Sequence, residues 1–328
     1  MEKMLISAYK EKRILVTGYE GFLGSWLTKV LLSYDAKIWG LDIKTHRKET
    51  ILSKQDLSKV KVIKGSVENF SLVSKIVKEN KIEFIFHLAA KALVEDCLKN
   101  PLKAFSSNIR GTWNILEASR NCDTIKGIII SSSDKAYGIQ SKLPYMENSP
   151  LAGCHPYDIS KSSADLLAYT YFHTYGLPVC ITRCGNIFGP GDFNFSRIVP
   201  DAVRSAIQDK TLLVRSDGKF TRDYIYIEDI IKGYLFLAEK MQKLKLFGEA
   251  FNFSNEKPIS VLGMIRIIYR LLDRKPKYRI LNHAKYEIRN QYLSAKKAHR
   301  TLGWKPQYTL EEGLKRAIRW YKGSFQDK

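Results

Sequence analysis

Short runs of apolar residues alternate with longer segments of mixed polarity along the first half of this chain. Such runs, bounded by polar residues, are typical of strands buried on both faces of a sheet. We expect strands at 12–17, 36–42, 60–64, 82–86, 127–130 and 177–183. The segments between them predict helices at 24–32, 71–80 and 101–122. Strands that alternate with helices predict an α/β fold with a Rossmann-like, doubly wound parallel sheet.

The pattern loosens after residue 184. Residues 185–196 are rich in Gly, Asn and Pro and are expected to form a loop, whereas 261–272 and 310–321 are expected to be helical. Ser260 is a suitable N-cap for the first of these helices. We therefore predict a Rossmann-like domain over 1–184, to which 223–254 returns, and a smaller C-terminal lobe formed mainly by 185–328.

A glycine-rich turn joins the first strand to the first helix, with the sequence TGYEGFLG from Thr17 to Gly24. Gly18 permits a tight turn, Gly21 lets backbone N–H groups approach a pyrophosphate, and Gly24 lets the helix pack closely on the strand. The spacing is GxxGxxG rather than the commoner GxGxxG, and three glycines alone also serve ordinary turns. Gly18, Gly21, Phe22, Leu23 and Gly24 are the predicted phosphate-binding residues.

An acidic residue, Asp42, ends the second predicted strand, 18 residues after Gly24. A carboxylate there can accept hydrogen bonds from the ribose hydroxyls of a dinucleotide and disfavours a 2′-phosphate. This position favours NAD as the cofactor, while the basic residues at 46–48 leave NADP open.

A tyrosine and a lysine four residues apart, Tyr157 and Lys161, share one helical face. A buried ammonium beside a phenol is expected to lower the pKa of the phenol, which can then act as a general base. Directly after the strand at 127–130, Ser133, Asp134 and Lys135 place a hydroxyl, an acid and an amine side by side. The YxxxK spacing is common by chance, but its combination with the glycine turn, Asp42 and Ser133 is specific.

These features resemble the extended short-chain dehydrogenase/reductases that act on nucleotide sugars, and the resemblance covers nearly the whole chain. The shared stretches lie at 17–24, 87–90, 108–112, 133, 157–161, 184–192, 222–224 and 302–306. Within that family, the spellings at 21–27, 133–135 and 191–201 look most like those of the CDP-glucose 4,6-dehydratases.

The resemblance implies a nucleotide-sugar 4,6-dehydratase that recycles NAD internally. Ser133, Asp134, Lys135, Tyr157 and Lys161 would be catalytic, with Asp134 as an acid and Lys135 as the base at the sugar C5. An alternative for Lys135 is a substrate ligand without a role in proton transfer. Ala89, Tyr157 and Lys161 would also contact the cofactor. Candidate contacts of the nucleotide sugar are Asn186, Arg197, Arg215 and Arg222, although a surface salt bridge is the alternative for each arginine.

The resemblance also implies a homodimer that packs through the helices at 101–122 and 157–175, with pairing into a tetramer left open. His87 is expected to pack near the cofactor without a catalytic role. Cys154 and His155 could contact the substrate, but no third group that would make them a nucleophilic pair is apparent.

Composition adds few constraints to this picture. The chain has 328 residues, 45% of them hydrophobic, and it lacks an apolar run long enough to span a membrane. The first ten residues lack the apolar core of a secretory signal, and the five cysteines show no metal-binding spacing, so we expect a cytoplasmic protein without a metal.

The net charge of +21 is compatible with a nucleic-acid binder. We instead expect solvated lysines and a field that attracts an anionic substrate, with no nucleic-acid partner. The rival functions are a C4-epimerase or another dehydrogenase of the same fold, and a non-catalytic NAD-binding scaffold.

Overall fold

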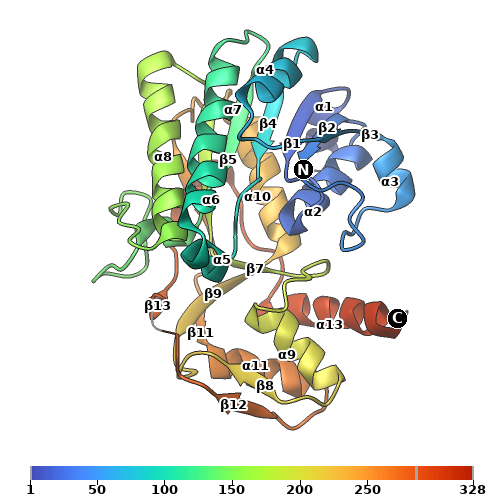
Figure 1. The fold of residues 1–328 in the computed structure, drawn as a ribbon, viewed down its shortest axis with the longest axis vertical. Helices are drawn as coiled ribbons and strands as arrows, with labels where there is room; N and C mark the ends of the chain where they lie inside the picture. Colours follow the sequence, from blue (N-terminus) through green and yellow to red (C-terminus); the bar gives the residue numbers. More distant parts are fainter. Residues whose placement is uncertain (1, 285–286, 327–328) are drawn as a thin grey trace.

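The apolar runs of the first half form one parallel sheet in the computed structural model, which describes residues 2–284 and 287–326 (Figure 1). The sheet has seven strands, and every neighbouring pair is parallel. Across the sheet they are β10 (Ala250–Phe253), β6 (Val179–Cys184), β5 (Gly127–Ser131), β4 (Phe84–His87), β1 (Arg13–Thr17), β2 (Lys37–Asp42) and β3 (Val60–Lys64). The chain winds outwards from β1 in both directions, so the predicted doubly wound fold is confirmed.

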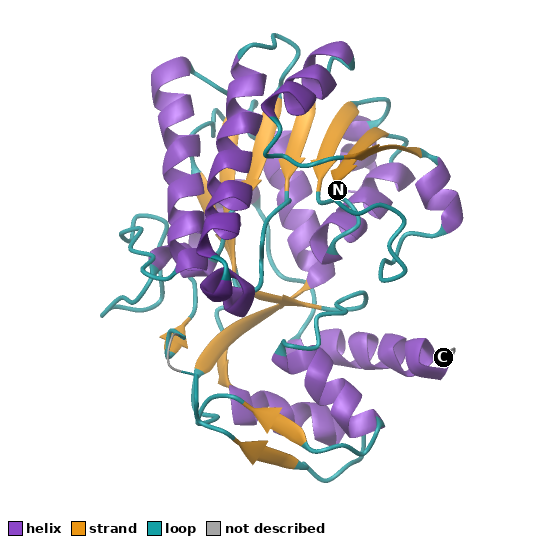
Figure 2. Cartoon of the chain, in the orientation of Figure 1, coloured by secondary structure: helices purple, strands orange, loops and turns teal. Residues whose placement is uncertain are grey.

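Helices cover both faces of this sheet (Figure 2). One face carries α4 (Phe70–Glu79), α7 (Gly111–Arg120) and α8 (Pro156–Tyr175), which pack side by side. The other carries α1 (Glu2–Tyr9), α2 (Phe22–Ser33), α10 (Ile227–Lys240) and α12 (Lys296–Leu302). Shorter helices are α3 (Lys54–Ser58), α5 (Val94–Lys99), α6 (Pro101–Phe105) and the 3₁₀ turn η2 (Asp134–Tyr137).

The core explains why the strand sequences are apolar at consecutive positions. In β5, Ile129 belongs to the cluster on one face, whereas Ile128 and Ile130 belong to the cluster on the other. Because successive side chains of a strand point to opposite faces, a sheet covered on both sides needs apolar residues at every position.

A second, smaller lobe lies beyond the carboxyl ends of the sheet strands (Figure 1). It contains the strands β7 (Asn186–Phe188), β9 (Thr221–Tyr226), β11 (Pro258–Ser260) and β13 (Asn290–Gln291), and a pair formed by β8 (Leu212–Val214) and β12 (Tyr278–Ile280). Its helices are α9 (Ile198–Ile207), α11 (Val261–Leu271) and α13 (Leu310–Gln326). Ser260 caps α11 as predicted, because its side chain accepts a hydrogen bond from the N–H of Gly263.

Several predicted elements differ from the structure, and α2, β6 and α13 do so at their ends: α2 begins at Phe22, β6 begins at Val179 and α13 continues to Gln326. The helix expected at 101–122 is interrupted by a π-helical turn, η1 (Ser106–Arg110), between α6 and α7. The strand expected from residue 82 begins at Phe84. The loop expected at 185–196 contains β7, which pairs in parallel with β9, so this strand depends on a partner that a local pattern does not reveal.

Candidate active site

The glycine-rich turn has the geometry that its sequence predicts. Gly18 adopts a φ of +72°, and a Cβ placed on Gly24 would lie 2.0 Å from the carbonyl oxygen of Gly18. Phe22 and Leu23 lie in the first turn of α2, where backbone N–H groups have no intrahelical acceptor. The N-cap, Gly21, has no side chain that could accept a hydrogen bond from them. This helix start is suited to a pyrophosphate.

Ala89 lies against this turn, because a Cβ on Gly18 would lie 3.0 Å from the Ala89 nitrogen. The N–H of Ala89 donates to the Thr17 hydroxyl over 3.1 Å. The segment that follows β4 is therefore in direct contact with the glycine turn.

Asp42 ends β2 in a buried position, and only one of its two carboxylate oxygens accepts hydrogen bonds from described residues. Its Oδ1 accepts hydrogen bonds from the N–H of Lys44 at 3.2 Å and from Arg47 Nη2 at 2.7 Å. Its Oδ2 and Arg47 Nε are both buried and lack a hydrogen-bond partner among the described residues. Two unpartnered polar atoms beside the glycine-rich turn fit the ribose hydroxyls of a dinucleotide, so these residues fit NAD.

Glu20 fixes the segment that carries Arg47, and the sequence analysis missed this role. Its carboxylate accepts the backbone N–H groups of His46 at 2.9 Å and Arg47 at 2.6 Å. The position of Glu20 inside the glycine turn gave no signal of a partner 26 residues away.

Tyr157 and Lys161 both lie on α8 and face the carboxyl end of β5. Lys161 Nζ donates to the carbonyl oxygen of Ser131 over 2.7 Å and lies 6.0 Å from the centre of the Tyr157 ring. Burial lowers the pKa of Lys161 to about 8. Burial also raises the pKa of Tyr157, although a hydrogen bond with Ser133 works in the opposite direction.

The direction of the Tyr157 shift corrects the sequence-based expectation of a lowered pKa. Removal of the phenol from water is the largest cause of the raised pKa, and the charges of Asp134 and Asp158 add to it, so the hydrogen bond with Ser133 is outweighed in the protein alone.

Ser133 and Asp134 start the η2 turn beside Tyr157. Ser133 Oγ donates to Asp134 Oδ1 over 2.9 Å and accepts the N–H of Lys135 at 3.2 Å. Asp134 is buried, and its Oδ2 lacks a partner among the described residues. A carboxyl oxygen is therefore available to a ligand beside the Ser133 hydroxyl.

Lys135 extends from the same turn to the second lobe. Its Nζ donates to Gln291 Oε1, on β13, over 3.2 Å. Burial lowers the pKa of Lys135, the charge of Arg222 adds to this effect, and Asp134 opposes it. Gln291 is buried and its Nε2 has no partner among the described residues. No sequence signal identified Gln291, because its role depends on the register of β13 beside β9.

Arg222 is the predicted phosphate ligand that lies nearest this pair. It is buried on β9, where Nη1 donates to the carbonyl oxygens of Thr221 at 2.9 Å and Arg289 at 3.1 Å. Its Nη2 lies 3.3 Å from Glu287 Oε2.

The other predicted substrate residues lie in the second lobe at its boundary with the sheet. Asn186 begins β7, and Arg197 precedes α9, where its Nη1 lies 2.9 Å from Asp192 Oδ2. Arg215 pairs with Glu95 of α5 and donates to the Ser196 carbonyl over 2.9 Å, so it bridges the two lobes.

His87 is neutral and structural, in line with its predicted packing role. Thr112 donates its hydroxyl to the Asn108 carbonyl at 2.6 Å, so His87 Nε2 must donate to Thr112, at 3.2 Å. His87 Nδ1 then accepts from Thr17 at 2.9 Å. Burial lowers the pKa of His87 to about 3.

Asn108, in the π-helical turn, holds the segment after β4 in place. Its Oδ1 accepts the N–H of Lys91 at 2.7 Å, and its Nδ2 donates to the Lys91 carbonyl at 3.1 Å and to Ser160 Oγ at 2.9 Å. A π-helical turn at a functional site is a recurrent feature.

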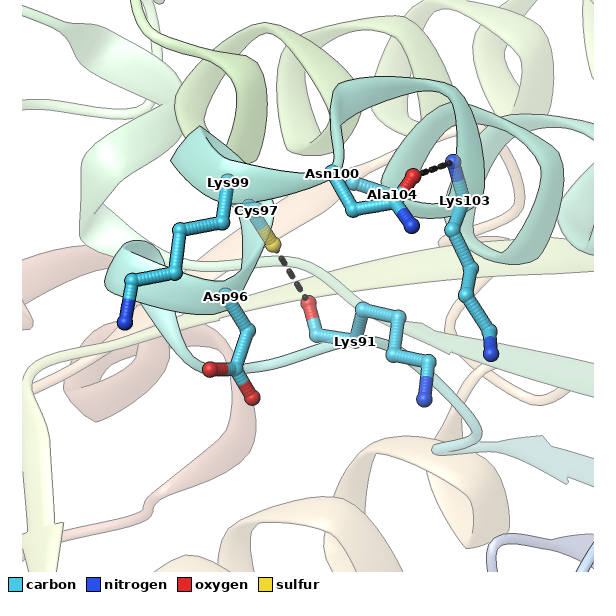
Figure 3. A pocket seen from close by; sticks show the side chains of 7 residues that line it. All are labelled: Lys91, Asp96, Cys97, Lys99, Asn100, Lys103 and Ala104. Carbon is cyan, nitrogen blue, oxygen red and sulfur yellow. Dashed lines mark hydrogen bonds between the residues drawn. The ribbon is translucent and has the colours of Figure 1, made fainter.

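A cavity of about 280 Å³ lies on the Lys91 side of the site (Figure 3). The lining residues drawn there are Lys91, Asp96, Cys97, Lys99, Asn100, Lys103 and Ala104. Cys97 and Ala104 form an apolar cluster with Tyr157, and Cys97 Sγ donates to the Lys91 carbonyl over 3.4 Å. The cavity therefore shares part of its wall with the packing behind Tyr157.

No helix within residues 2–284 and 287–326 combines the length and apolar character that a membrane span needs.

A family model and two curated relatives that resemble this chain are described as nucleotide-sugar epimerases or dehydratases. Residues 15–317 match the family model described as GDP-mannose 4,6 dehydratase. The chain is 32% identical over 327 residues to a UDP-glucuronate 4-epimerase of Thermodesulfobacterium geofontis, covering 95% of this chain and 97% of that one. It is 28% identical over 332 residues to the CDP-glucose 4,6-dehydratase of Salmonella typhimurium, covering 96% and 91%.

A solved structure agrees with these relatives. The dTDP-glucose 4,6-dehydratase of Bacillus anthracis, in complex with NAD, superposes with a TM-score of 0.85 at 29% identity, covering 96% of this chain and 98% of that one.

Proposed function

We propose, since the chain belongs to the family of NAD-dependent nucleotide-sugar epimerases and dehydratases, that it is a nucleotide-sugar 4,6-dehydratase. The observation that carries this proposal is the buried pair formed by Asp134, with an unpartnered carboxyl oxygen, and Lys135, with a lowered pKa. The product would be a 4-keto-6-deoxy sugar, and CDP-glucose is the first substrate to test.

Oxidation at the sugar C4 would be the task of Tyr157, Lys161 and Ser133. Tyr157 takes the proton of the O4 hydroxyl, which Ser133 holds by a hydrogen bond. The ammonium of Lys161 stabilises the phenolate form of Tyr157. Bound at the glycine turn and Asp42, NAD would supply the hydride acceptor for C4 and the hydride donor for C6.

Elimination would be the task of Asp134 and Lys135. Once C4 is a ketone, the C5 proton is acidic, and Lys135 in its neutral form takes it. Asp134 gives a proton to O6, which leaves as water. The hydride then adds to C6 and the proton returns to C5. The lowered pKa of Lys135 supports its role as the base, because only an amine without a proton can accept one.

Substrate phosphates would be held by Arg222, together with Asn186, Arg197 and Arg215 at the edge of the second lobe. Arg222 is supported best, because it is buried and its charge acts on Lys135. For the cofactor, Asp42 supports NAD, because its buried carboxylate, whose Oδ2 lacks a partner among the described residues, suits ribose hydroxyls and disfavours a 2′-phosphate.

A C4-epimerase is the second candidate, and the 32% identity to a UDP-glucuronate 4-epimerase favours it. That reaction needs Ser133, Tyr157 and Lys161 but no elimination pair. Incubation of the protein with CDP-, GDP-, UDP- and dTDP-hexoses in D₂O distinguishes the dehydratase from the epimerase activity. A 6-deoxy-4-ketose with deuterium at C5 establishes dehydration, whereas a hexose inverted at C4 that retains O6 establishes epimerisation.

For the architecture, we propose that 1–184 together with 223–254 bind the cofactor and that the remainder of 185–328 mainly binds the substrate. We also propose a homodimer that packs through the helices at 101–122 and 157–175. Its support is an exposed apolar face on those helices, with Leu102 79% exposed and Trp113, Leu166 and Tyr169 between 43% and 54% exposed. Light scattering on Leu166→Glu, compared with the unaltered chain, tests the dimer, and an unchanged mass would refute this packing.

A further inference from the structure

Three potential metal ligands meet at the start of α8, next to Tyr157. One ligand atom each from Cys154, His155 and Asp158 can be chosen so that all three lie within 4.8 Å of one another. The sequence analysis found no third group that would make Cys154 and His155 a nucleophilic pair, and it expected no metal; the structure adds Asp158 as a third potential metal ligand. Asp158 comes close to Cys154 and His155 because it lies in the first turn of α8, directly after the loop that carries them.

We propose that Cys154, His155 and Asp158 form a binding site for a divalent transition-metal cation of the zinc class at the entrance to the active site.

The ligand types match this class of cation. A thiolate, an imidazole and a carboxylate are the three groups that zinc accepts, and sites with three protein ligands leave a fourth position to water or substrate. Zinc bonds of about 2.0 to 2.3 Å place tetrahedral ligands roughly 3.5 Å apart. The observed limit of 4.8 Å can therefore close by small side-chain rotations of Cys154 and His155.

The backbone around the three ligands is held in place. The N–H of Gly153 donates to Ser162 Oγ over 3.2 Å, and the His155 carbonyl accepts the N–H of Ile159 at 2.8 Å. A Cβ on Gly153 would lie 2.4 Å from the Asp158 carbonyl carbon, so this glycine lets the loop pack directly on the helix. Because all three ligands lie within five residues of one turn, the ion would not need to order a distant segment.

Burial and charge also fit a cation. Asp158 is 3% exposed. Cys154 is exposed and His155 partly so, which leaves an approach from solvent. With a dication bound, the charges of the ion, the thiolate and the carboxylate sum to zero, so no net positive charge is placed beside Lys135, whose charge acts on Asp158.

The test is a titration of the purified full-length chain with Co²⁺, which reports a thiolate ligand by a sulfur-to-cobalt charge-transfer band and tetrahedral geometry by intense visible bands. We expect one Co²⁺ per chain, displaced by Zn²⁺ with loss of colour. Cys154→Ser should abolish the charge-transfer band, and His155→Gln should keep it while weakening binding about tenfold or more.

Cys122→Ser is the matched control, because Cys122 is another partly exposed thiol but has no place in this cluster. It should bind Co²⁺ like the unaltered chain. No charge-transfer band in the unaltered chain, or equal behaviour of Cys154→Ser and Cys122→Ser, would overturn the proposal. Circular dichroism confirms that each variant is folded. No sugar substrate is used, so the outcome is independent of the proposed dehydratase activity.

Discussion

The cofactor side and the substrate side of this site are built differently. The glycine turn and Asp42 lie within 25 residues of one another, on adjacent strands, and the turn presents backbone N–H groups while Asp42 presents a carboxylate. On the substrate side, Lys135 reaches Gln291 across 156 residues, and Arg222 comes from a different sheet. Local sequence therefore prescribes the first region, whereas the second exists only when the two lobes meet.

The largest loss of turnover should come from a change of Tyr157, which is proposed to contact both the cofactor and the substrate. Tyr157→Phe removes the proton acceptor and should reduce turnover by about 10³-fold, within the usual range for general bases, with NAD affinity nearly unchanged. Steady-state kinetics and a cofactor titration measure the two quantities. Tyr169→Phe, an exposed tyrosine on the same helix, is the control. A Tyr157→Phe variant with ordinary turnover would refute the assignment.

Lys135→Met should separate the two half-reactions on the substrate side. Oxidation remains possible, so reduced cofactor absorbance should rise on mixing with substrate, but release of the dehydrated product should fall by about 10²-fold or more. Gln291→Leu removes the hydrogen-bond acceptor of the Lys135 amine and should lower the rate of product release by about tenfold, the size of one net hydrogen bond. Lys142→Met, on an exposed loop, should change neither quantity. Normal product release by Lys135→Met would place the base elsewhere.

Asp42→Asn tests the cofactor side alone. Loss of the charge that orders Arg47 and faces the ribose should weaken NAD binding by about tenfold or more. Turnover at saturating NAD should be nearly unchanged. Binding is measured by calorimetry, with the exposed turn residue Asp35→Asn as the control. An equal loss in both variants would contradict a direct role of Asp42.

Gly24→Ala tests whether the cofactor side depends on backbone proximity. Its Cβ would overlap the Gly18 carbonyl, so we expect a loss of about 1–3 kcal/mol in the free energy of unfolding, together with weaker NAD binding. Gly323→Ala in α13, where a Cβ meets no atom within 4 Å, should be neutral or slightly stabilising. Denaturant unfolding compares them, and equal stabilities would exclude the steric account.

The last prediction is a pH dependence of the free energy of unfolding caused by Lys161. Its pKa falls from 10.5 to about 8 on folding, so between these values the unfolded chain binds more protons. The Lys161 contribution to the free energy of unfolding should therefore rise as pH increases from about 8 to 10.5, and lie at its lowest below that window. Unfolding of Lys161→Met at matched pH values gives the reference. If the free energy of unfolding of Lys161→Met and of the unaltered chain changed with pH in the same way, a lowered pKa of Lys161 would be contradicted.

The sequence alone determined the sheet and the cofactor turn. Apolar runs predicted six of the seven strands of the sheet, because strands buried on both faces must be continuously apolar. The glycine turn, Asp42 and the Tyr157–Lys161 pair were identified for an equally local reason, since one turn or one helical face holds each of them. Only the tertiary structure decided the surroundings of Lys135. Gln291 and Arg222 become its neighbours through strand pairing in the second lobe, and pairing between distant segments leaves no periodic trace in either one. The same holds for Tyr157, whose pKa depends on the depth of its burial.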